Sequence, residues 1–130
     1  MKRFTKVFYL ACIVVAANSA NAGEKELNMR GVMCDSIDFN ELNTYSQEEL
    51  EALYCSYDKG HKIADKTMTA AADKHKGTRT EVAILQDGIR AMERCSRPMM
   101  RVGELLKRKF SGTKHIRCED YKGYTPQDPN

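Results

Sequence analysis

Apolar and polar positions over residues 46–76 follow the period of an α-helix. A row of mostly apolar side chains recurs at alternating spacings of three and four residues: Leu50, Tyr54, Tyr57, His61, Ala64, Met68, Ala71 and His75. This spacing places the row on one helical face. Ser46 and Glu49 have the spacing of a capping box, which begins a helix, and Gly77 can end one in a left-handed conformation. The pattern predicts a helix near 47–76.

The same pattern restarts directly after Gly77. Thr78 and Glu81 form a second capping-box pair. A second row with spacings of three and four follows them: Val82, Leu85, Ile89, Met92, Ser96, Met99, Gly103, Leu106 and Phe110. A helix near 80–110 is therefore predicted. Because two long helices joined by a short turn must fold back on each other, the expected fold is all-α, an antiparallel hairpin of long helices.

Pro98 interrupts the second predicted helix. Its nitrogen cannot donate a hydrogen bond to the carbonyl of Arg94, so we expect a kink or a break between Cys95 and Pro98. Ser96 could cap a helix that restarts there.

The segments outside the hairpin carry weaker signals. We expect a short N-terminal helix before Ser46, and after Gly112 an extended tail that is tethered at Cys118 and loose over 122–130. Strand signals are almost absent and no repeat occurs. Residues 23–130 are therefore predicted to form a single small helical domain.

Residues 1–22 have the pattern of a cleavable signal peptide. Lys2, Arg3 and Lys6 precede an apolar run over 7–17, and small residues end the segment at Ala22. The run is shorter than the about 20 apolar residues that span a bilayer. We expect cleavage after Ala22, a periplasmic or secreted protein, and no stable membrane insertion after cleavage. An uncleaved anchor, or a lipoprotein modified at Cys12, is the less favoured alternative.

Export changes the charge of the chain. The full sequence has 21 basic and 18 acidic side chains, but three of the basic residues leave with the signal peptide. The exported chain then has a formal net charge of zero, which removes the main support for a nucleic-acid partner.

Four cysteines remain after cleavage, and an even number in a small exported domain predicts two disulfides. A hairpin that turns near residue 76 favours nested bridges, Cys55–Cys95 inside and Cys34–Cys118 outside. However, this turn places Cys55 about five residues, or about 7 Å, from the level of Cys95. The other two pairings therefore stay open. Structural zinc is not expected, because no two cysteines have the close spacing of zinc ligands.

Histidine, methionine and acidic side chains in the two predicted helices suggest a soft-metal site or acid–base chemistry, and core packing is the alternative. His61 and Met68 lie on one face, and Met92 could approach them from the second helix, which makes these three residues weak candidates for cuprous ion. Seven-residue spacing separates His61 from Met68 by about 10 Å, so methionines that fill an irregular core are favoured. Asp58, His61 and Asp65 could support acid–base chemistry, but no known catalytic motif accompanies them. We expect no cofactor and no enzymatic activity.

A basic run in the second helix is the main candidate for partner binding. We assign this role to Arg94, Arg97, Arg101, Lys107, Arg108, Tyr54 and Tyr57, because arginine and tyrosine often anchor protein interfaces. The alternative is internal: residues 35–51 are acidic, and the hairpin would place them opposite the basic residues of 101–117.

These observations favour an exported, non-enzymatic protein that acts by protein–protein contact in the bacterial envelope, as an inhibitor, an immunity-type protein or an accessory subunit. In size, export and helix content the chain resembles the small two-disulfide helical immunity proteins that protect bacteria from cell-wall amidases. This resemblance is one of outline, and no motif residue carries it. A periplasmic copper-binding or stress-related helical chaperone is the alternative, although the L-T-x-x-Q repeats of Spy-like chaperones are absent. A small hydrolase is third.

Overall fold

The first long helix begins at the predicted capping box. In the computed structural model, which describes residues 24–125, α4 spans Gln47–Lys74. The Ser46 hydroxyl accepts a hydrogen bond from the Glu49 nitrogen at 3.1 Å, and the Glu49 carboxylate accepts one from the Ser46 nitrogen at 3.1 Å. These two bonds satisfy backbone donors that a helix start leaves free. The predicted helix near 47–76 is confirmed.

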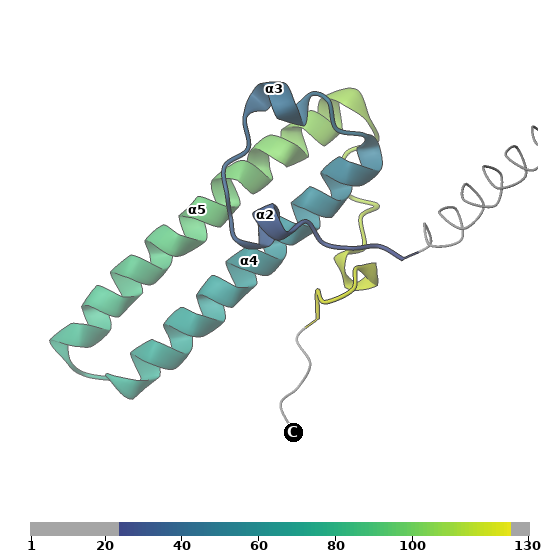
Figure 1. The fold of residues 1–130 in the computed structure, drawn as a ribbon. Helices are drawn as coiled ribbons and strands as arrows, with labels where there is room; N and C mark the ends of the chain where they lie inside the picture. The colour runs from purple at the N-terminus through teal and green to yellow at the C-terminus, as the bar shows by residue number, and fades with distance from the viewer. Residues whose placement is uncertain (1–23, 126–130) are drawn as a thin grey trace, which may run out of the picture.

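The second long helix follows after a turn of four residues. Gly77 has a φ of 82°, a left-handed conformation that glycine adopts without steric cost. Thr78 then caps α5, Arg79–Lys109, by accepting a hydrogen bond from the Glu81 nitrogen at 3.4 Å. Figure 1 shows α4 and α5 side by side and antiparallel along their whole length. The all-α hairpin is confirmed.

Pro98 does not break α5. The helix is continuous from Arg79 to Lys109 with Pro98 inside it, so the expected break near Cys95 is absent. Ser96 also does not cap a new helix; its hydroxyl donates instead to the Glu93 carbonyl at 3.4 Å. The buried residues on both sides of Pro98, Cys95 and Val102, hold α5 against the rest of the molecule, and this packing outweighs the loss of one backbone bond.

Two short helices precede α4 and lie at the open end of the hairpin. They are α2, Met29–Val32, and α3, Phe39–Leu42. The contact of α2 with α4 is close because both sides contribute small residues. A Cβ on Gly31 would lie 2.6 Å from the Ser56 Cβ, and the Ser56 hydroxyl accepts a hydrogen bond from the Asn28 nitrogen at 2.7 Å.

The main hydrophobic cluster lies at this end of the hairpin. Its buried members come from the loop after α2, from α3, and from the first half of α4 and the second half of α5: Ile37, Leu42, Leu50, Leu53, Tyr57, Val102, Leu105 and Leu106. The half nearer the Gly77 turn consists of α4 and α5 alone, with no other described segment beside it (Figure 1). The molecule therefore has a packed end and a two-helix arm.

The contact face of α5 differs from the predicted row within the arm. Gly88 lies against α4, because a Cβ there would come 2.3 Å from the Met68 sulfur. Cys95 and Val102, at steps of seven residues from Gly88, are buried. Val82 and Ile89 are exposed instead, since adjacent positions on a helix are rotated by about 100°. In this half of the helix, the row that begins at Val82 therefore does not form the contact with α4.

The disulfides are interleaved and not nested. Cys34 pairs with Cys95 and Cys55 pairs with Cys118, with Cα–Cα distances of 4.7 and 5.3 Å. The nested prediction was wrong because residues 34 and 118 do not continue the lines of the two helices. The chain turns at Cys34, which has a φ of 60°, and reaches α5, while the segment after α5 returns along α4 to Cys55. The two disulfides indicate an oxidising, exported environment.

The tail is held further along than expected. After the 3₁₀ helix η2, Cys118–Asp120, the Lys122 nitrogen donates to the Lys25 carbonyl at 2.9 Å. Lys59 donates to the Tyr124 carbonyl at 2.8 Å, and the Tyr124 hydroxyl hydrogen-bonds Asp58. Residues 122–124 are therefore fixed, contrary to the prediction of a loose segment from 122. The predicted signal peptide, 1–22, and the last part of the tail, 126–130, lie outside the described residues.

Within residues 24–125, no helix is both long and apolar enough to cross a membrane.

Candidate partner-binding surface

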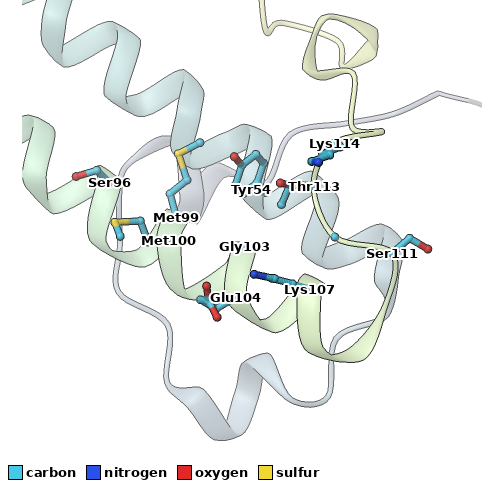
Figure 2. A pocket seen from close by; sticks show the side chains of 11 residues that line it. Tyr54, Ser96, Met99, Met100, Gly103, Glu104, Lys107, Ser111, Thr113 and Lys114 are labelled. Atoms are coloured by element: carbon cyan, nitrogen blue, oxygen red, sulfur yellow. The ribbon is translucent and has the colours of Figure 1, made fainter.

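The packed end carries an open hollow between α5 and the loop that follows it. The hollow has a volume of about 560 Å³ and an apolar floor. Figure 2 shows Tyr54 of α4, Met99 and Lys107 of α5, and Thr113 of the following loop around it. Gly103 has no side chain to fill the hollow, and a Cβ there would lie 3.5 Å from the Tyr54 ring.

A second, smaller hollow lies on the other side of the same turn of α5. Its volume is about 230 Å³, and Phe39 of α3, Arg101 and Arg108 line it. Both hollows include Met100 and Glu104, so these two side chains form a ridge between them. We call the two hollows together with this ridge the Met100 surface.

Large apolar side chains are unusually accessible on the Met100 surface. Met100 is 70% exposed and Phe39 is 54% exposed. Side chains of this size are normally buried, and accessible apolar patches rimmed by polar groups often mark interaction sites. Methionine is suited to such a site because its flexible thioether adapts to different partners.

A hydrogen-bonded group fixes α3 and therefore the position of Phe39. Glu41 of α3 accepts hydrogen bonds from the Tyr45 hydroxyl at 2.5 Å and from Arg30 at 2.6 Å. These two donors hold the pKa of the Glu41 carboxyl below its ordinary value, the Tyr45 hydroxyl being the larger cause. Phe39 is thus presented from a short helix that is anchored to both its neighbours.

All five predicted basic side chains face solvent, but only Arg101, Lys107 and Arg108 line the hollows. Arg94, Arg97, Arg101, Lys107 and Arg108 are all exposed. Arg97 contacts Glu93 at 3.6 Å, whereas the other four have no carboxylate within 4.0 Å among the described residues. Their charge is therefore available to a partner.

The acidic segment before α4 neutralises little of this charge. Between residues 35–51 and 101–117, the described chain contains one side-chain contact to a carboxylate, from His115 to Glu51 at 2.7 Å. Lys109 bonds the Asn43 carbonyl at 3.1 Å and not a carboxylate. Among the described residues, no arginine or lysine of 101–117 pairs with a carboxylate of 35–51, so the internal explanation of the basic run is not supported.

Of the two candidate tyrosines, only Tyr54 reaches the surface. Tyr57 is 1% exposed and belongs to the core. Its hydroxyl donates to the Asp35 carbonyl at 2.5 Å, and burial raises its pKa to about 12. The assignment of Tyr57 to partner binding was wrong, because α4 buries two adjacent sectors at its packed end and not the single row that the spacing indicated.

The weak metal candidates occupy packing positions. Met68 lies against Gly88 between the two helices, and His61 and Met92 are half-buried. Residues 24–125 contain no group of three histidine, cysteine or acidic side chains that could hold a metal ion. Asp58, which we considered with His61 and Asp65 for acid–base chemistry, binds the Tyr124 hydroxyl and lies 3.5 Å from Lys62.

The predicted partner-binding set left out Phe39, Met100 and Lys114, although Lys114 belongs to the basic residues of 101–117. Phe39 stands in a short polar stretch with no periodic pattern, so only its size could have drawn attention to it. Lys114 lies beyond the predicted helix, in the loop that closes the larger hollow. Met100 is adjacent to the predicted row and becomes visible only once the orientation of α5 is known.

Comparison with models of known protein families, with curated protein sequences and with solved structures finds no match to this chain.

Proposed function

We propose that this chain is an exported protein that acts by binding another protein through the Met100 surface. In this proposal residues 1–22 are a signal peptide removed after Ala22, and the folded domain works in the bacterial envelope without catalysing a reaction. Its role is that of an inhibitor, an immunity-type protein or an accessory subunit of an envelope complex.

The observation that carries this proposal is the pair of hollows on either side of Met100. They bring exposed apolar side chains, Met100 and Phe39, next to Arg101 and Arg108. Neither arginine has a carboxylate within 4.0 Å in the part of the chain that the structure describes. Aromatic, methionine and arginine side chains are enriched at protein interfaces, and residues that fill pockets supply most of the binding energy. We therefore expect the partner to have an acidic surface that faces the arginines and one or two apolar side chains that insert into the hollows.

The experiment that tests this function is affinity capture with matched variants. The oxidised exported protein is incubated with envelope extracts of its host and of competing bacteria, and stoichiometric partners are identified. We expect a partner whose affinity falls at least tenfold on Met100→Glu or Arg101→Glu, because each change introduces a carboxylate opposite an acidic surface. Lys76→Glu is the matched control. It reverses one positive charge, as Arg101→Glu does, but at the far end of the arm, and it should leave capture unchanged.

Two outcomes would contradict the proposal. One is that no protein is captured at stoichiometric amounts from any extract. The other is capture that is equally sensitive to Lys76→Glu and to Arg101→Glu, which would indicate non-specific charge attraction. If the captured partner is an enzyme, its inhibition by the domain supports the inhibitor or immunity role, and its unchanged activity supports an accessory role.

A further inference from the structure

The two-helix arm exposes a row of apolar side chains far from the Met100 surface. Val82, Leu85 and Ile89 are 56%, 36% and 53% exposed, and Met92 continues the row in a half-buried position. No described segment covers this part of α5 (Figure 1). The row lies outside both hollows, so partner binding at the Met100 surface does not explain it.

The spacing of the row is that of a helix–helix seam. From Val82 to Met92 the steps are three, four and three residues, the pattern in which two helices interlock side chains along a narrow line. The contact with α4 uses a different line on α5, which includes Gly88. In the arm, α5 therefore has two apolar lines, and α4 occupies only one.

We propose that a second copy of this chain covers the Val82 row, with the two α5 helices antiparallel. In a two-fold symmetric contact the same patch faces itself, so the row must complement its own reverse. When α5 is laid antiparallel on itself, Val82 faces Met92 of the second copy and Leu85 faces Ile89. All four layers of the contact are then apolar, and the two arms together form a four-helix bundle.

The polar residues that border the row fit this antiparallel arrangement. Positions 79, 86 and 93 follow one another at steps of seven residues along one edge of the row. In the antiparallel register Gln86 meets Gln86 at the two-fold axis, and Arg79 meets Glu93 of the second copy. Arg79 has no carboxylate within 4.0 Å among the described residues, and Glu93 has only an exposed contact with Arg97 at 3.6 Å. The chain thus carries complementary charges at the two ends of the contact.

The contact is small, and this sets the expected affinity. Stable complexes bury about 800 Å² on each partner. Four apolar layers on one helix face, with two flanking ion pairs, cover less than that, so the dimer is expected to form at micromolar concentrations and to exchange with the monomer. The dimer leaves both Met100 surfaces free, so it does not depend on the proposed function.

Analytical ultracentrifugation of the oxidised exported protein, up to several hundred micromolar, tests the proposal. We expect a monomer–dimer equilibrium whose dissociation constant rises at least tenfold on Leu85→Glu. Ile63→Glu is the matched control, because Ile63 is a 45% exposed apolar residue of α4 outside the row, and it should leave the equilibrium unchanged. Circular dichroism of both variants checks that the helices are intact.

A charge exchange tests the orientation of the two helices. Arg79→Glu alone, or Glu93→Arg alone, should weaken the dimer several-fold, since each places like charges together at both ends. The double variant with both changes restores opposite charges and should recover the original dissociation constant. A monomer at all concentrations, equal effects of Leu85→Glu and Ile63→Glu, or a double variant weaker than either single variant would overturn the proposal.

Discussion

At the scale of single residues, glycine decides how closely the segments approach. A Cβ on Gly60 would lie 2.5 Å from the Val32 carbonyl oxygen and 2.6 Å from the Cys34 sulfur. Both neighbours are held, the first by backbone and the second by a disulfide, so neither can move aside cheaply. We expect Gly60→Ala to lower the free energy of unfolding by about 1–3 kcal/mol through overpacking, as measured by urea unfolding with the disulfides intact.

Gly103→Ala provides the matched control in the same experiment. It lies inside α5, about two turns from the end of the helix, and its added Cβ would meet the Tyr54 ring at 3.5 Å, an ordinary contact. Because alanine favours helices over glycine by about 0.5–1 kcal/mol, this variant should be more stable than the wild type. The same sign for both substitutions would contradict the packing described here.

The sequence does not predict that alanine would have opposite effects on stability at Gly60 and Gly103, because each is simply a helix-weakening residue inside an apolar pattern. The difference between them arises from what lies opposite, and that depends on the loop after α2. The same holds for Tyr54 and Tyr57. They are three residues apart in one predicted row, yet Tyr54 reaches the surface and Tyr57 is buried in the core.

At the scale of elements, the helix ends were predictable and the helix orientations were not. Ser46 and Thr78 act locally, through bonds to residues three positions on, so their effect can be read from sequence. The face that α5 turns toward α4 depends instead on long-range packing. The Val82 row has the better apolar spacing, yet Gly88 permits the closer approach, and α4 packs on the line that contains Gly88.

Pro98 allows a direct test of how α5 is stabilised. Pro98→Ala restores a backbone donor for the Arg94 carbonyl and removes the clash of the proline ring, a gain of up to about 3 kcal/mol. Without proline the unfolded chain has more conformational freedom, and this reduces the gain in stability by about 0.4–1 kcal/mol. We expect a net increase of about 1–2 kcal/mol in the free energy of unfolding, measured by denaturant titration. A decrease would indicate that a bend at Pro98 is required to seat Cys95.

At the scale of the whole molecule, the number of disulfides was predictable but their pairing was not. The nested prediction paired cysteines at equal sequence distances from the turn near Gly77. It therefore assumed that the chain outside the hairpin extends the two helices. Cys34 and Cys118 instead cross to the helix that is distant in sequence. That route depends on the short α2 and α3 helices and on the return of the tail, none of which has a strong sequence pattern.

The pairing has a measurable consequence for stability. The bridges close segments of nearly equal length, with sequence separations of 61 and 63 residues. In the loop-entropy account each bridge then stabilises the fold by about 4 kcal/mol. We expect the paired variant Cys34→Ser, Cys95→Ser and the paired variant Cys55→Ser, Cys118→Ser to lose similar amounts in thermal unfolding. Non-reducing peptide mapping checks the pairing, and a Cys55–Cys95 peptide would contradict it.

The interleaved bridges also determine what a protease can release from this chain. Backbone cleavage at the exposed Gly77 turn would leave both halves joined twice, through Cys34–Cys95 and through Cys55–Cys118. Even two cuts, one in each of any two of the three intervals between successive cysteines, would leave a single covalent molecule. Nested bridges would instead free the central fragment after cuts on both sides of it. A protein cleaved in this way would keep all the segments that line the two hollows next to Met100 covalently connected.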